Sequence, residues 1–117
     1  MLPPLKDPQK TGDIIMDITV NQEGKTITIK VNGDIDENGA EMLKAQFGRL
    51  NLTTIKDVII DFSNVHYIGS SGIGKLLLFY KNIAVNGGSI TIVNTQDTVY
   101  SLFQELKLNS ILTIQRV

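Results

Sequence analysis

Two adjacent serines in a glycine-rich stretch are the residues of this sequence best placed to do chemistry. Ser70 and Ser71 follow Gly69, between an apolar segment that ends near Phe62 and a segment with helical periodicity. Serine hydroxyls at the N-terminus of a helix can cap the helix, bind an anion or accept a phosphate. Four interpretations are therefore open: a nucleotide-phosphate loop, a nucleophilic serine, a helix cap and a phosphorylation switch.

The phosphate-loop interpretation is the weakest. Residues 69–75 match the G-x-x-x-x-G-K pattern, in which the lysine, here Lys75, reaches the phosphates. The next residue of that pattern is Ser or Thr, whose hydroxyl holds Mg²⁺. This position is Leu76, and an apolar side chain cannot bind a cation. We therefore expect no cofactor and no metal, and keep nucleotide binding only as an alternative.

A hydrolytic serine requires a base, and the sequence offers little for that role. The stretch reads G-S-S-G rather than G-x-S-x-G, and the only histidine is His66, four residues before Ser70. No acid that would orient this histidine is evident. We therefore expect a protein without catalytic activity, in which Ser70 or Ser71 caps the helix, accepts a phosphate, or does both.

Hydrophobic periodicity predicts a single α/β domain around this stretch. Alternating residues at 14–20 and 26–31 predict an antiparallel hairpin with one buried face, and residues 55–62 predict a central strand buried on both faces. Helical spacing predicts helices from 37 to about 50, from 71 to about 85 and near 99–106, with Asp36 as the first N-cap. With further strands at 89–93 and 111–114, the order is β-β-α-β-α-β-α-β, which indicates a mixed sheet with parallel crossovers and helices packed against it.

Composition excludes several classes of function. A net charge of -1 gives no basic surface for nucleic acid, and the absence of cysteine excludes disulfides and thiolate metal sites. No apolar run approaches the ~18 residues of a membrane span. Residues 1–12 contain all three prolines and lack the pattern of a secretory signal. We interpret them as a flexible lead-in to a domain at residues 13–117, in a cytoplasmic protein.

Three stretches together resemble the STAS domain family, in particular its single-domain anti-sigma factor antagonists. Residues 31–36, VNGDID, resemble the family's G-[DE]-[IL]-D turn. Residues 58–63 with Tyr67 and Ile68 resemble its central strand and the approach to its site. Residues 70–74, SSGIG, resemble the second part of its D-S-S-G-L-G motif. The resemblance covers residues from about 14 to 114 and implies a STAS-like mixed sheet.

The resemblance also implies a protein-binding switch. In the family, the serine after the motif's Asp is phosphorylated by an anti-sigma factor that is also a serine kinase. Phosphorylation abolishes binding, and a phosphoserine phosphatase resets the switch. By position the acceptor is Ser70, with Ser71 as the alternative. The implied partner-binding surface comprises Gly33, Asp34, Asp36, Gly69, Ser70, Ser71, Gly72 and Gly74.

The sequence departs from the family pattern at residue 69, where Gly replaces the motif's Asp. The missing carboxylate removes a charge beside the acceptor hydroxyl, so that Ser71 could become the acceptor or the switch could be lost. The alternative function is then a non-switching STAS protein-binding module in a scaffold, stress-sensing or lipid-transport assembly. Many relatives continue into a final helix after the last strand, so a partner or a second copy, in a homodimer, could cover part of the sheet here.

Overall fold

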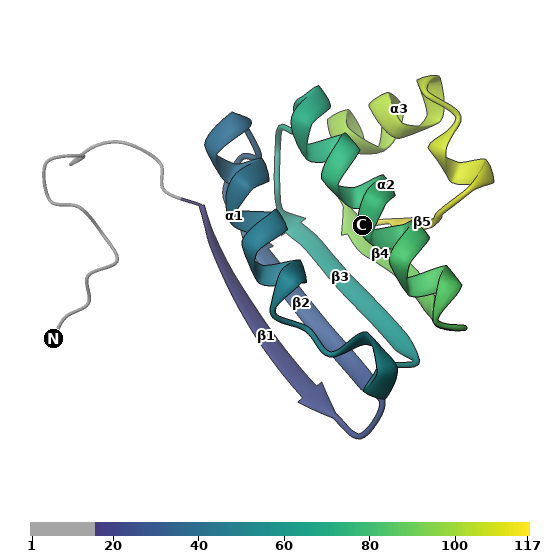
Figure 1. Cartoon of the computed structure of the whole chain (residues 1–117). Coiled ribbons are helices and arrows are strands. Elements are labelled where there is room, and N and C mark those ends of the chain that lie inside the picture. The colour runs from purple at the N-terminus through teal and green to yellow at the C-terminus, as the bar shows by residue number, and fades with distance from the viewer. Residues whose placement is uncertain (1–15) are drawn as a thin grey trace, which may run out of the picture.

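The sheet contains five strands in the order in which they occur in the chain, β1-β2-β3-β4-β5, in a computed structural model that describes residues 16–117 (Figure 1). The strands are β1 Asp17–Glu23, β2 Thr26–Asn32, β3 Asp57–Asn64, β4 Ser89–Thr95 and β5 Thr113–Arg116. The helices are α1 Glu37–Gly48, α2 Ser70–Val85 and α3 Asp97–Glu105, with short 3₁₀ turns η2 Leu52–Thr54 and η3 Leu108–Ser110. The antiparallel hairpin β1-β2 and the parallel pairing of all later strands confirm the predicted fold class. The lead-in predicted at residues 1–12 lies outside the described residues.

One face of the sheet is packed against the helices, and the other is not. Right-handed crossovers between parallel strands in sequential order place every connecting helix on the same side, and Figure 1 shows α1 and α2 in front of the sheet. Along β3, Val58 and Ile60 are buried, whereas Ile59 and Asp61, which alternate with them, are only half-buried. The prediction of a central strand buried on both faces is therefore wrong, because within residues 16–117 no helix covers the second face.

The hairpin shows the same one-sided burial, which weakens toward the edge of the sheet. On β2, Ile27 and Ile29 are buried, as the alternation predicts. Their neighbours on β1 are less covered, since Ile18 is half-buried and Val20 is 40% exposed. The predicted single buried face is confirmed for β2 and only partly present on the edge strand β1.

Two aromatic pairs join the helices to each other and to the sheet. The rings of Phe47 on α1 and Phe79 on α2 are stacked, with centroids 3.9 Å apart. Phe62 at the end of β3 packs against Phe103 of α3 at 6.3 Å. The first contact joins the C-terminal part of α1 to the second half of α2, and the other packs α3 against β3.

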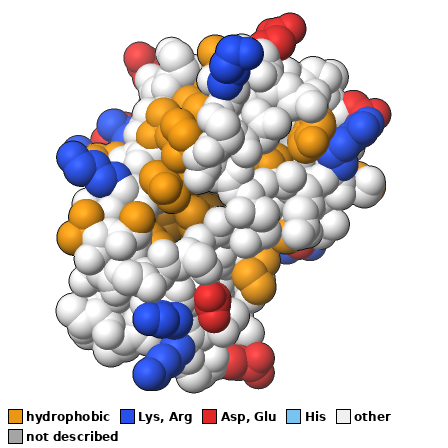
Figure 2. Space-filling model, turned by 90° about the vertical axis from the view of Figure 1, so that its right-hand side faces the viewer, with side chains coloured by type: hydrophobic (Ala, Val, Ile, Leu, Met, Phe, Trp, Pro, Cys, Tyr) orange, Lys and Arg blue, Asp and Glu red, His pale blue; other side chains and the backbone are white. Residues whose placement is uncertain are grey.

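Large apolar side chains remain exposed in the C-terminal part of the chain. Leu106 is 49% exposed, Ile111 48% and Val117 78%. Figure 2 shows the side of the molecule turned toward α3 and β5, where hydrophobic side chains reach the surface at several places. Nothing in the structure identifies what would cover them, so the homodimer stays a prediction. Within residues 16–117, every helix is too short or too polar to cross a membrane.

Thr95 is a buried residue whose hydroxyl finds no hydrogen-bond partner among the described residues. Valine has nearly the same shape without the hydroxyl, and burying an unpaired polar group costs about 1–3 kcal/mol. We expect Thr95→Val to raise the free energy of unfolding by about 1 kcal/mol and the melting temperature by about 4 °C, measured by thermal and urea denaturation. Thr91→Val, on the uncovered face of the same strand, is the control and should change little. A lower melting temperature for Thr95→Val would show that the hydroxyl stabilises the fold.

Candidate functional site

Two loops that are far apart in the sequence are joined by backbone hydrogen bonds at the carboxyl ends of β2 and β3. The N–H of Ile35 donates to the carbonyl of Tyr67 at 2.8 Å, and the N–H of Gly69 donates to the carbonyl of Ile35 at 2.9 Å. Ile35 and Ile68 form a parallel bridge, and both side chains are buried. The structure therefore brings together the turn at residues 33–36 and the serine stretch, which the resemblance assigned to one surface.

The turn at residues 33–36 is fixed by a glycine and a helix cap. Gly33 has φ +116°, and a Cβ atom there would lie 2.9 Å from Cα of Met16, so only glycine fits. Asp36 confirms its predicted role, because its carboxylate accepts a hydrogen bond from the N–H of Gly39 at 2.8 Å and caps α1. Asp34, between them, is half-exposed. Gly33 and Asp36 thus shape the turn, and Asp34 remains accessible.

The serines lie within the first turn of α2 rather than at its cap. The N-cap is Gly69, with φ -91° and ψ 177°, and no side chain caps this helix. The prediction that Ser70 or Ser71 caps α2 is therefore wrong, because both residues already have helical backbone. Ser70 is exposed and Ser71 half-buried. The uncapped N–H groups and the positive end of the helix dipole favour a negative group at this position.

The two glycines that follow the serines differ in their surroundings. Gly72 is buried, and a Cβ atom there would lie 2.6 Å from Cγ2 of Ile35 and 2.9 Å from Cγ1 of Ile68. Gly74 is exposed, and a Cβ atom there would meet nothing within 4 Å. Only Gly72 is therefore required for close packing. Its lack of a side chain lets the first turn of α2 pack directly against Ile35 and Ile68.

A polar network around Asp61 holds the start of the serine loop at the end of β3. Its Oδ1 accepts hydrogen bonds from the N–H of Ser63 at 2.8 Å and from Nδ2 of Asn94 at 3.3 Å. Partial burial acts to raise the pKa of Asp61, but these hydrogen bonds and the ammonium of Lys30 outweigh it and hold the pKa below its usual value. The carboxylate is therefore ionised at neutral pH and serves to position the loop.

Comparison with known proteins identifies the family. The family model described as the STAS domain matches residues 17–117. The chain belongs to the STAS domain family. The family match confirms the sequence resemblance, and the folds of solved relatives agree with it.

Three relatives illustrate the similarity. The anti-sigma-B factor antagonist of Bacillus subtilis (strain 168) is 26% identical over 99 residues, which cover 85% of this chain and 90% of that protein. The structure of an anti-sigma factor antagonist from Mycobacterium paratuberculosis has a TM-score of 0.77 at 19% identity, over 88% of this chain and 87% of that one. The Bacillus cell fate determinant SpoIIAA in its phosphorylated form has a TM-score of 0.67 at 19% identity, over 84% and 90% of the two chains. At these identities the structures establish the STAS fold, and the individual site residues stay predictions.

Residue 69 is where this STAS domain departs from the family motif, and a tyrosine occupies the space beside it. A Cβ atom on Gly69 would lie 3.0 Å from Oη of Tyr67, so an aspartate there would require the tyrosine to move. Tyr67 is 54% exposed, and its ring lies beside Gly69, the residue before Ser70. Sequence reasoning did not predict that Tyr67 lies beside Gly69, although an aromatic residue two positions before the motif was visible as a signal.

The two catalytic alternatives find no support in the geometry. Residues 70–75 belong to α2, so they cannot wrap a phosphate as a loop, and Nζ of Lys75 lies 3.7 Å from Oε2 of Glu41 on α1. His66 lies exposed in the loop, where its carbonyl accepts a hydrogen bond from Oγ1 of Thr98 at 3.4 Å. Among the described residues, no group of three His, Asp or Glu side chains gathers as a metal site. The arrangement presents a hydroxyl on a rigid surface and is suited to binding.

Proposed function

We propose that this STAS domain is an anti-sigma factor antagonist whose binding to an anti-sigma factor kinase is switched off by phosphorylation of Ser70. The observation that carries the proposal is the exposed Ser70 at an uncapped helix N-terminus, on a surface built from two hydrogen-bonded loops. The names of the relatives support the same function. In this proposal the protein acts by binding and has no catalytic activity of its own.

Accessibility favours Ser70 over Ser71 as the acceptor. A kinase must reach the hydroxyl oxygen in line with the γ-phosphate, which requires a side chain open to solvent. Ser70 is exposed, whereas Ser71 is half-buried. The N-terminus of α2 then stabilises the phosphoryl group that is added.

Phosphorylation adds negative charge to a proposed surface whose own charged residues are Asp34 and Asp36. A phosphoserine adds about -1.5 to -2 charges at neutral pH. The carboxylate of Asp36 accepts a hydrogen bond from Gly39 and caps α1, whereas Asp34 is half-exposed. A partner surface that packs against the small Ser70 hydroxyl and accommodates Asp34 would be repelled by the added phosphate. A phosphoserine phosphatase would remove the phosphate and restore binding.

Incubation with the cognate anti-sigma factor kinase and ATP, followed by peptide mass mapping, tests the proposal. We expect one phosphate, located on Ser70, which is retained in Ser71→Ala and lost in Ser70→Ala. Both variants keep the fold, because neither hydroxyl makes a hydrogen bond that caps α2. Phosphate on Ser71 alone, or on neither serine, would overturn the assignment of Ser70.

The second candidate function is a non-switching protein-binding module in a larger assembly. Gly69 favours it, because the family motif has an acid beside the acceptor and this chain has none. Such a module binds its partner constitutively, so its affinity would not respond to a negative charge at residue 70.

A further inference from the structure

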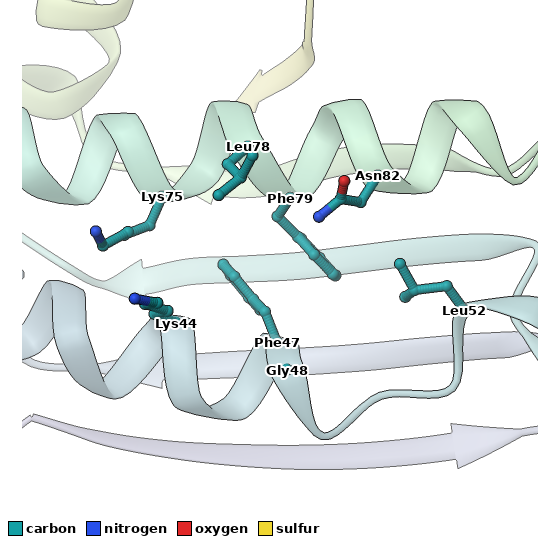
Figure 3. Close-up of a pocket in the computed structure, with 8 residues that line it drawn as sticks. All are labelled: Lys44, Phe47, Gly48, Leu52, Lys75, Leu78, Phe79 and Asn82. Atoms are coloured by element: carbon teal, nitrogen blue, oxygen red, sulfur yellow. The ribbon is translucent and has the colours of Figure 1, made fainter.

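A groove between α1 and α2 lies apart from the serine surface, and the proposed switch does not use it. It has a volume of about 210 Å³ and is lined by side chains of α1, α2 and the η2 turn (Figure 3). Its floor is formed by Phe47 and Phe79, whose stacked rings are nearly parallel at 5°. Leu78 stands on its rim and is 53% exposed, which is a large exposure for a leucine in the middle of a helix.

One end of the groove is cationic. Lys44 of α1 and Lys75 of α2 extend toward this end from opposite sides (Figure 3). Glu41 pairs with Lys75 at 3.7 Å, and its side chain is 67% exposed. Lys44 has no ion-pair partner within residues 16–117, so one positive charge at this end is left uncompensated.

The other end of the groove is uncharged. Leu52, from the η2 turn after α1, and Asn82 of α2 lie there (Figure 3). From Lys75 to Asn82 the helix advances about 10 Å at about 1.5 Å per residue. A single extended chain of about this length fits along the groove.

We infer that this groove binds a medium-chain alkyl carboxylate, with the alkyl chain on the phenylalanine floor and the carboxylate at Lys44 and Lys75. A volume of about 210 Å³ along this apolar floor has room for an alkyl chain. A cationic end, an apolar floor and an uncharged far end match the head, body and tail of such a ligand. The carboxylate replaces or joins Glu41 as the partner of the lysines.

Titration with decanoate below its micelle concentration, followed by amide chemical shifts of ¹⁵N-labelled full-length protein, tests the inference. We expect saturable shifts centred on residues 44–52 and 75–82. Decyltrimethylammonium, which has the same chain with a cationic head, should bind at least about tenfold more weakly. Equal binding of the two amphiphiles, or shifts elsewhere on the surface, would overturn the inference.

Variants separate the charged end from the apolar floor. Lys44→Glu and Lys75→Glu should each weaken decanoate binding about tenfold, whereas Lys81→Glu, an exposed lysine of α2 outside the groove, should not. Gly48→Leu should block the groove, because a Cβ atom at Gly48 meets nothing within 4 Å and the new side chain has room to enter it. Far-UV circular dichroism confirms the fold of each variant.

The same variants identify a different occupant. If decanoate causes no shifts while Gly48→Leu weakens the binding of a protein partner, the groove receives a partner side chain and the inference is wrong. Phosphorylation of Ser70 is measured separately, so either proposal can fail without the other.

Discussion

Ser70→Glu is expected to weaken binding of the anti-sigma factor by about 100-fold, equal to about 2.7 kcal/mol. The substitution places a permanent carboxylate at the exposed start of α2, directly after the hydrogen bond that joins the two loops. A charge buried in an interface without a partner loses its solvation, and like charges brought together across an interface cost several kcal/mol. Isothermal titration calorimetry with the purified anti-sigma factor measures the change.

Two variants serve as controls for this prediction. Ser70→Ala removes the acceptor without adding charge and should bind within about threefold of the unmodified protein, because it leaves a small apolar group. Ser70→Ala should also remain bound when kinase and ATP are added. Unchanged affinity of Ser70→Glu would instead support the non-switching module.

Gly72→Ala is expected to destabilise the fold by about 2 kcal/mol, although alanine usually stabilises a helix. The new Cβ would lie 2.6 Å from Ile35 and 2.9 Å from Ile68, and both isoleucines are buried. Overpacking a core costs about 1–3 kcal/mol and outweighs the helix-propensity gain of about 0.5–1 kcal/mol. Urea denaturation measures the free energy of unfolding, and we expect a lower midpoint with an unchanged slope.

Gly74→Ala is the matched control, on the same helix and with the same substitution. No atom lies within 4 Å of its added Cβ, so only the helix propensity changes. We expect Gly74→Ala to raise the free energy of unfolding by about 0.5–1 kcal/mol. If both variants raise the free energy of unfolding, the packing of Gly72 against Ile35 and Ile68 leaves room for a methyl group, and the prediction is wrong.

Local sequence signals predicted much of the fold. The order of strands and helices followed from periods of two and 3.6 residues, which reflect local geometry. Asp36 was predicted as an N-cap because an Asp before a helical segment can satisfy a backbone N–H three residues later, and it does so with Gly39. The parallel crossovers followed from the alternation of strands and helices.

Two predictions were wrong. One depended on the exact residue at which α2 begins, and the other on the handedness of the crossovers between strands. The motif places two serines near the start of α2, but the backbone dihedrals make Gly69 the cap and Ser70 the first helical residue. The apolar run in β3 suggested burial on both sides, yet sequential right-handed crossovers place the helices on one side and leave Ile59 half-buried.

The sequence by itself determined that the two serines follow Gly69 in a strand-helix connection without a catalytic base. Only the tertiary structure decided how that connection is used. Hydrogen bonds between Ile35, Tyr67 and Gly69 join two loops more than thirty residues apart, and burial distinguishes Ser70 from Ser71 and Gly72 from Gly74. These contacts form because β2 and β3 pair in parallel, which brings their carboxyl ends together. Residue spacing within one segment cannot predict the pairing of strands that are far apart in the sequence.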